Sequence, residues 1–224
     1  KMTEGNVTRR LAPFTVPLIL SGLCQQLCKW VDAFIVGNIE GETALAGIGA
    51  TTSVYNLFVT VITGFTSGLS VLAAQRYGMG EKGKIRKLLS SYTVLFALLF
   101  TVISIAGAVF TEEILAVLDT PETIFSSARS YLNILFAGIP FLAVYNTYSS
   151  VLRGIGNSRA PFFSVLVCSA VNVAHDLLFV AGMGYGAAGA AAATAISQAA
   201  MKVYIIAYTV RKYPFLRFSF SGKL

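Results

Sequence analysis

Charged residues are scarce in this chain. Of its 224 residues, 12% are charged and 55% are hydrophobic, and only 10 are acidic. A soluble globular domain carries about 25% charged residues, and the mean hydropathy of this chain is strongly positive. The composition therefore excludes an ordinary water-soluble domain and predicts a polytopic membrane protein.

Histidine and cysteine are too few to build a metal centre. Cys24 and Cys28 share a helix face, but Cys168 lies far along the chain and no histidine or third thiol near the pair completes a set of ligands. The single histidine, His175, directly precedes Asp176, a pair that suggests a proton relay or a membrane hydrolase. Adjacent helical residues point about 100° apart, and no motif supplies a nucleophile. We therefore do not expect an enzyme.

Long apolar runs, in contrast, are abundant. Six of them reach the length of about 20 residues that crosses a bilayer, and each must be helical because lipid offers its backbone no partners. The predicted helices cover residues 11–36, 44–73, 88–110, 124–152, 161–182 and 187–210. We predict an all-α membrane protein in which residues 1–210 form one six-transmembrane-helix bundle. Residues 211–224 would be a cytoplasmic tail or the start of a linker.

Basic and acidic residues alternate between successive connecting segments. Basic residues gather in residues 1–10, 76–87, 153–159 and 211–223, and acidic residues in 40–42 and 112–122. Because Lys and Arg are retained on the cytoplasmic side, this pattern predicts that both termini are cytoplasmic. The net charge of +7 is then an orientation signal, and no nucleic-acid partner is expected.

Asp32 and Asp176 lie inside apolar spans, where a carboxylate costs about 2.5–3.5 kcal/mol on insertion scales. With a rise of about 1.5 Å per residue, both lie roughly 8 Å below the outward ends of their helices. Further polar side chains come near the same level: Asn172, Thr194, Tyr131 and, about two turns below Asp32, Gln25. These residues are predicted to line one cavity.

Structural roles for the same residues stay open at this point. Asp32 has Lys29 three residues before it, so the two would form an ion pair within one helix. Asn172, Thr194 and Tyr131 would each serve as an ordinary interhelical hydrogen-bond partner, worth about 0.6 kcal/mol. Asp176 has no lysine or arginine near it in the sequence, so a structural ion pair explains it less well.

Several segments together resemble multidrug and toxic compound extrusion (MATE) transporters. They occur in order along nearly the whole chain: Val16-Pro17-Leu18-Ile19, Val31-Asp32-Ala33-Phe34-Ile35-Val36-Gly37, Gly68-Leu69-Ser70-Val71-Leu72-Ala73-Ala74-Gln75, Leu152-Arg153-Gly154-Ile155-Gly156-Asn157 and Val171-Asn172-Val173-Ala174-His175-Asp176. The resemblance implies the amino-terminal six-helix lobe of an efflux carrier in a bacterial or archaeal plasma membrane. Such a carrier exports organic cations or other amphipathic compounds in exchange for protons or sodium.

The resemblance also implies roles for single residues. A cation or proton site, and the sodium site if sodium is the coupling ion, would comprise Asp32, Asn172, Asp176 and Thr194. Tyr131 and Gln25 correspond to residues that line the cavity. Pro17 removes a helix hydrogen bond and allows a bend, which makes it the hinge. No cofactor is expected besides the coupling ion.

The chain departs from the family in having one six-helix lobe, where a complete member has two. Either the chain is a fragment or two copies assemble side by side, as parallel transporter repeats do, and we favour a fragment. Two further functions stay open: a flippase for a lipid-linked sugar precursor, for which Lys29 is the candidate cation, and a structural lobe that does not itself transport.

Overall fold

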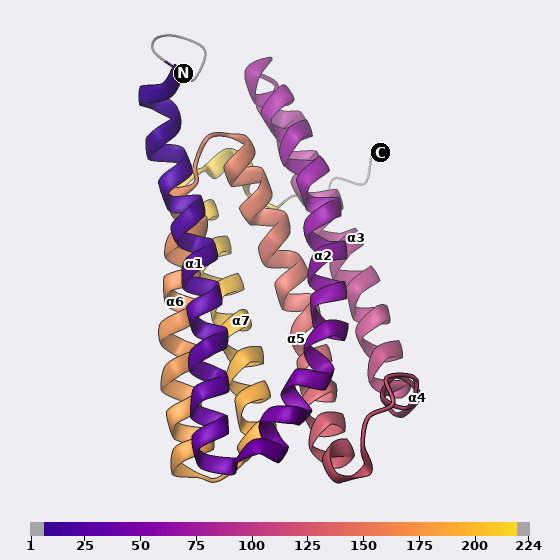
Figure 1. The fold of residues 1–224 in the computed structure, drawn as a ribbon. Helices are drawn as coiled ribbons and strands as arrows, with labels where there is room; N and C mark the ends of the chain where they lie inside the picture. The colour runs from indigo at the N-terminus through magenta and orange to yellow at the C-terminus, as the bar shows by residue number, and fades with distance from the viewer. Residues whose placement is uncertain (1–6, 219–224) are drawn as a thin grey trace.

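Each apolar run of the sequence forms a helix in the computed structural model, which describes residues 7–218 (Figure 1). The six membrane-length helices are α1 (Val7–Glu40), α2 (Glu42–Gly78), α3 (Lys82–Val109), α5 (Glu122–Gly154), α6 (Arg159–Asp176) and α7 (Gly186–Lys212). The prediction of an all-helical six-span bundle is confirmed. Most helix ends lie a few residues beyond the apolar runs, because the backbone stays helical where its side chains become polar.

The sequence pattern did not predict three short elements that the described residues form. The helix α4 (Thr111–Val117) lies within the acidic connection, η1 (Leu177–Gly182) is a π-helix that continues α6, and η2 (Pro214–Leu216) is a 3-10 turn. The predicted span 161–182 therefore changes from α-helix to π-helix after Asp176. Leu216 is fully buried, so part of the predicted tail packs against the bundle.

The helix α5 lies at the centre of the bundle and packs against α2, α3 and α7. Aromatic side chains fill one part of this core: the rings of Phe58 and Phe136 meet edge to face with centroids 5.4 Å apart, and Phe96 and Phe100 do so at 5.6 Å. The helix α1, in contrast, lies at the side of the bundle against α6 and α2 (Figure 1). Large apolar side chains on α1, such as Trp30 and Phe34, are exposed.

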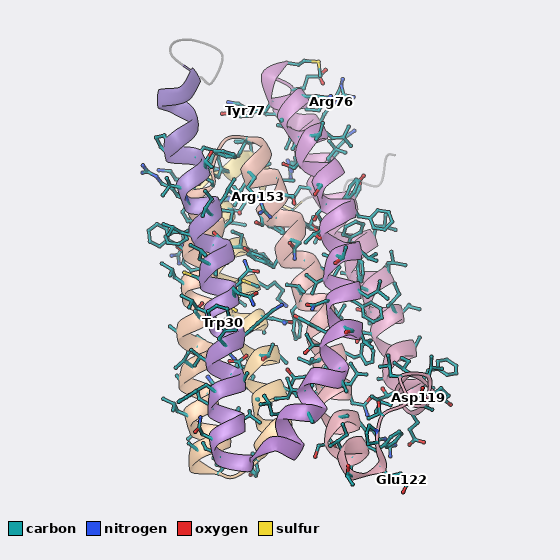
Figure 2. The ribbon with its side chains drawn as sticks, viewed as in Figure 1. Trp30, Arg76, Tyr77, Asp119, Glu122 and Arg153 are labelled. Atoms are coloured by element: carbon teal, nitrogen blue, oxygen red, sulfur yellow. The ribbon has the colours of Figure 1, made fainter. Side chains whose placement is uncertain are left out.

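Charge separates between the two ends of the bundle. Figure 2 shows Arg76 and Arg153 toward the end that also holds the start of α1, and Asp119 and Glu122 at the opposite end. The structure thus places basic and acidic connections at opposite ends, as the alternating pattern requires. Lys1 and Lys223 lie outside the described residues, as do the side chains of Arg9, Arg10, Glu40 and Glu42.

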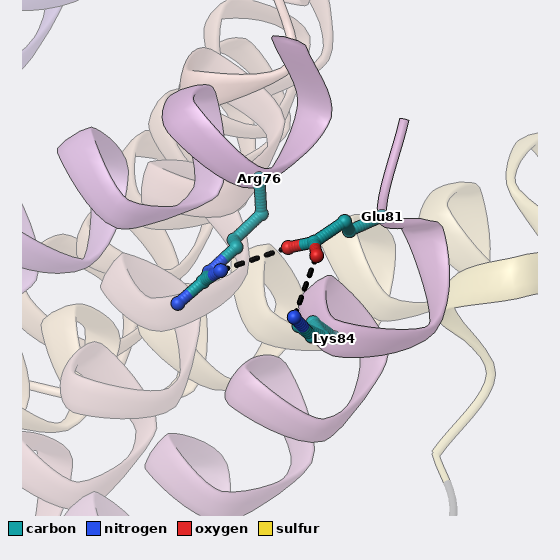
Figure 3. A network of polar contacts seen from close by, with 3 residues as sticks. All are labelled: Arg76, Glu81 and Lys84. Carbon is teal, nitrogen blue, oxygen red and sulfur yellow. Dashed lines mark hydrogen bonds and ion pairs between the residues drawn. The ribbon is translucent and has the colours of Figure 1, made fainter. Parts of the chain in front are cut away.

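The connection between α2 and α3 is held by a small ionic network (Figure 3). The Glu81 carboxylate accepts hydrogen bonds from Arg76 at 2.8 Å and from Lys84 at 2.5 Å. These two cations hold the pKa of the Glu81 carboxyl below its usual range. Nearby, Arg86 Nε donates to the carbonyl of Arg217 at 2.9 Å, so the segment after α7 is tied to the same end of the bundle.

Candidate functional site

A cavity of about 850 Å³ lies between α1, α2, α5, α6 and α7. Five of the residues predicted for the site line it: Gln25, Asp32, Tyr131, Asn172 and Thr194. The structure therefore gathers side chains from four helices that are up to about 170 residues apart in the sequence. Asp176 is not among the lining residues, because its side chain is fully buried behind them.

The carboxyl groups of Asp32 and Asp176 face one another across the α1–α6 contact. They lie close enough for one to donate a hydrogen bond to the other when a single proton is shared. Among residues 7–218, no donor reaches Asp32 Oδ1 or either carboxyl oxygen of Asp176. Two adjacent carboxylates without donors are unfavourable when both are ionised. The pair therefore requires a proton or a cation to neutralise it.

Local structure explains how Asp176 comes to this position. It is the last residue of α6, where the chain widens into the π-helix η1 and then turns into α7. The start of α7 packs closely on this turn, since a Cβ on Gly189 would lie 3.0 Å from Tyr185 and 3.1 Å from Phe179. The small residues of the segment Gly186–Thr194 therefore allow α7 to approach the end of α6.

The other predicted site residues surround the acidic pair. Asn172 lies one turn before Asp176, is 4% exposed, and its Nδ2 has no acceptor within the described part of the chain. Thr194 is half-buried on α7 and Tyr131 is half-buried on α5. Tyr131 also packs against the apolar cluster formed by Val36, Val180, Ala187 and Ala190. Gln25 lies about two turns before Asp32 on α1 and is exposed to the cavity.

The alternative pairing of Asp32 with Lys29 is not observed. Lys29 Nζ instead donates to Asn56 Oδ1 on α2 at 3.2 Å, and no ion pair joins Lys29 to Asp32 within residues 7–218. His175 is also occupied elsewhere, because its Nδ1 lies 2.7 Å from the Val171 carbonyl and its ring meets the edge of Phe179. Its side chain therefore does not join the acidic pair.

Sequence reasoning missed the contribution of α2. Polar residues of this helix that line the cavity recur at helical spacing: Thr52, Tyr55, Thr63, Thr66 and Ser70. Tyr55 accepts a hydrogen bond from Gln198 Nε2 on α7 at 2.6 Å. The signal was present as a polar stripe with a period of three to four residues within an apolar span, which indicates a face turned away from lipid.

Residues 7–218 contain six membrane-length helices, and five of them enclose a cavity that has an acidic pair beside it, half-buried at Asp32 and buried at Asp176. This arrangement defines a polytopic membrane protein with an interior charged site. Residues 17–178 match the model of the MatE family. Because this match covers most of the chain, the chain belongs to the MatE family.

Curated relatives and solved structures agree with this assignment. The probable multidrug resistance protein YoeA of Bacillus subtilis is 32% identical over 96% of this chain and 47% of its own length, and YpnP of the same organism is 32% identical over 93% and 47%. The chain also shares the fold of a MATE crystal structure in the bent conformation, with a TM-score of 0.89, 22% identity, and coverage of 98% of this chain and 49% of the other. The chain thus spans about half the length of the relatives it matches.

Proposed function

We propose that this chain forms half of a secondary active efflux transporter that exports organic cations or other amphipathic compounds in exchange for protons or sodium. The observation that carries the proposal is the pair of facing carboxyl groups, Asp32 and Asp176, beside a cavity inside a membrane bundle. YoeA and YpnP are named as probable multidrug resistance proteins, which supports outward transport and drug-like compounds as the substrates.

Exchange follows from competition for the same negative charge. A coupling ion and a cationic substrate each neutralise the acidic pair, so binding of one weakens binding of the other. A bundle with two arrangements then carries substrate outward in one and the coupling ion inward in the other. Asn172 and Thr194 would orient the carboxyl groups.

Either coupling ion suits the side chains. A proton shared between Asp32 and Asp176 removes the repulsion between them. Sodium prefers hard oxygen ligands, as calcium and magnesium do, and the carboxyl oxygens without donors supply them together with the oxygens of Asn172 and Thr194. The site is thus compatible with both ions, and measurement of transport under each gradient distinguishes them.

The cavity suits a small organic substrate. Its volume of about 850 Å³ lies within the range of about 300–1,000 Å³ that holds drug-sized ligands. The aromatic side chains of Tyr55, Tyr131 and Tyr145 line it beside polar groups, which fits a molecule with both apolar and charged parts. Because the relatives are about twice as long, we propose that a second six-helix unit, in the same polypeptide or a second copy, completes the transporter.

Neutralising either carboxyl group is expected to stop exchange. In proteoliposomes with an imposed proton or sodium gradient, the full protein with Asp32→Asn or Asp176→Asn should move a fluorescent organic cation at near background rate, because the neutral amide no longer binds the coupling ion. Initial rates of uptake or release measure the effect.

Asp119→Asn provides the matched control. Asp119 lies at the acidic end of the bundle with a φ of 48°, a conformation that asparagine also adopts, so this variant should transport at the wild-type rate. Undiminished exchange in both Asp32→Asn and Asp176→Asn would overturn the proposed function.

A further inference from the structure

The short segment after α7 is held against the bundle at its basic end. Leu216 of η2 is fully buried, and η2 contacts both α3 and α7. Asn157 Nδ2 donates to the hydroxyl oxygens of Tyr208, at 3.1 Å, and Tyr213, at 3.0 Å, so the residue that precedes η2 is also fixed. The fold therefore determines where this segment begins and where its buried leucine lies.

Cations from α3 lie around the same segment. Lys82 Nζ lies 5.5 Å from the centroid of the Phe215 ring, and Arg86 Nε donates to the Arg217 carbonyl at 2.9 Å. An arginine carries five N–H donors, so this bond fixes the Arg86 guanidinium and leaves further donors for a ligand. Two more basic residues occupy the last turn of α7. Together these cations form a basic patch: Lys82, Arg86, Arg211, Lys212 and Arg217.

The basic patch has no acidic partner among the described residues. The sequence contains no Asp or Glu in residues 82–111 or 177–224. Glu81, which directly precedes α3, is already bound by two cations outside the patch, and no ion pair within residues 7–218 includes a residue of the patch. All five side chains except the half-buried Arg86 are exposed. The patch therefore offers positive charge to an anion from outside the chain.

The basic patch lies at the depth of lipid headgroups. The helix α3 has 28 residues and α7 has 27, so each is about 40 Å long at a rise of about 1.5 Å per residue. A bilayer measures about 40–45 Å with its headgroups, and its hydrocarbon core is about 30 Å thick. The start of α3 and the end of α7 therefore reach the headgroup region. Further into the membrane both helices expose apolar side chains, such as Leu95 and Val203.

We propose that the basic patch binds the phosphate headgroup of an anionic phospholipid in the leaflet at the basic end of the bundle. Arginine pairs with phosphate through two parallel hydrogen bonds, and each basic residue near an anionic membrane surface adds to the attraction. Because Arg86 also holds the Arg217 carbonyl, a phosphate on Arg86 links the lipid, α3 and the segment after α7. This site is independent of the compound that the central cavity transports.

Native mass spectrometry of the full protein in detergent micelles tests the proposal. The probes are phosphatidylglycerol, which is anionic, and phosphatidylcholine with the same acyl chains. Phosphatidylglycerol should bind at least about tenfold more tightly, since several basic residues contribute. Arg217→Gln keeps the backbone carbonyl that Arg86 binds, and it should weaken phosphatidylglycerol binding about fivefold, as for loss of one basic residue. Its phosphatidylcholine binding should change by less than about twofold.

Arg159→Gln is the matched control. Arg159 is also an exposed cation, but it begins α6, which lies on the opposite side of the bundle from α3 (Figure 1). This variant should bind phosphatidylglycerol as the wild type does. Arg86→Gln should lose at least as much affinity as Arg217→Gln. Arg86→Lys should recover part of that affinity, because it keeps the charge without the paired hydrogen bonds.

Three results would overturn the inference. The first is equal binding of the two lipids by the wild type. The second is an equal loss in Arg217→Gln and Arg159→Gln, which would show a diffuse attraction of the whole basic end. The third is displacement of the lipid by an equal concentration of glycerol phosphate, which would show a site for a free phosphate. Transport by Asp32→Asn and Asp176→Asn is measured separately, so the two proposals fail independently.

Discussion

Gly154 lies where α5 crosses α2 with almost no space between the two backbones. A Cβ at this position would lie 2.5 Å from the Ser70 carbonyl oxygen and 2.9 Å from Ala73 Cβ. The opposing atoms belong to backbone and to a small side chain, so they cannot rotate away. Because Ser70 lines the cavity, this contact also holds one wall of the cavity in place.

Gly154→Ala is accordingly expected to destabilise the protein by about 1–3 kcal/mol through overpacking. Gly68→Ala, on α2, serves as the control: nothing lies within 4 Å of a Cβ there, and alanine favours a helix over glycine by about 0.8–1.0 kcal/mol. Unfolding in mixed micelles with increasing SDS measures both. Equal effects of the two substitutions would contradict the close α2–α5 contact.

At the scale of elements, the helix ends and bends determine how the site is positioned. The change from α6 to the π-helix η1 directly follows Asp176, and α1 contains Pro13 and Pro17. The hydroxyl of Ser21 donates to the Pro17 carbonyl at 2.6 Å, a type of side-chain bond that often bends helices. The role of Pro17 as a hinge stays a prediction.

The turn between α2 and α3 gives a pH-dependent prediction. Lys84 and Arg76 lower the pKa of Glu81 in the folded protein. The carboxylate therefore stabilises the fold above its unfolded pKa of about 4.3, and this stabilisation is lost as pH falls through the lowered pKa. Glu81→Gln should lower the melting temperature by about one or two degrees at neutral pH, since exposed ion pairs contribute little. Thermal unfolding in detergent at several pH values measures this.

The difference between Glu81→Gln and the wild type should shrink as pH falls below the unfolded pKa of about 4.3, and it should disappear once pH is below the lowered pKa of Glu81 in the folded protein, where the wild-type carboxylate is also protonated. A difference that stays constant with pH would show that the Arg76–Glu81–Lys84 network does not depend on the charge of Glu81.

At the scale of the whole molecule, the ends of the bundle differ in charge, and this difference predicts its orientation. The basic end holds the start of α1 and the α2–α3 turn, and the acidic end holds α4 and the start of α5 (Figures 1 and 2). Positive charge is retained in the cytoplasm. We therefore expect the basic end to face inward and the acidic pair to lie in the outer half of the membrane.

Cysteine labelling in intact cells tests this orientation. In a background with Cys24, Cys28 and Cys168 replaced by serine, a membrane-impermeant maleimide should label Val117→Cys, whose native side chain is 84% exposed on α4. It should not label Lys87→Cys, at an exposed position near the start of α3, until the cells are opened. The reverse pattern of labelling would show that the bundle is inserted the other way.

Much of the candidate site was predictable because it depends on local periodicity. The rise along each helix places Asp32, Asn172 and Thr194 at comparable depths, and they do line one cavity. Depth does not define rotation about a helix axis, so the sequence left open whether Lys29 meets Asp32 or Asn56. The sequence also did not predict which residue is hydrogen-bonded to Gln198, because its partner Tyr55 lies 143 residues away. The functional roles of these residues stay predictions until they are measured.

The sequence by itself determined the membrane class, the six helices, the opposite charge of successive connections and the presence of two acidic residues within apolar spans. These features follow from composition and from runs of neighbouring residues, where the bilayer thickness and the helical rise are the relevant lengths. Only the tertiary structure decided that Asp176 is buried behind Asp32 and that Lys29 and Tyr55 line the same cavity. The reason is that side-chain packing between helices distant in the sequence sets the rotation of each helix, and no local pattern contains that information.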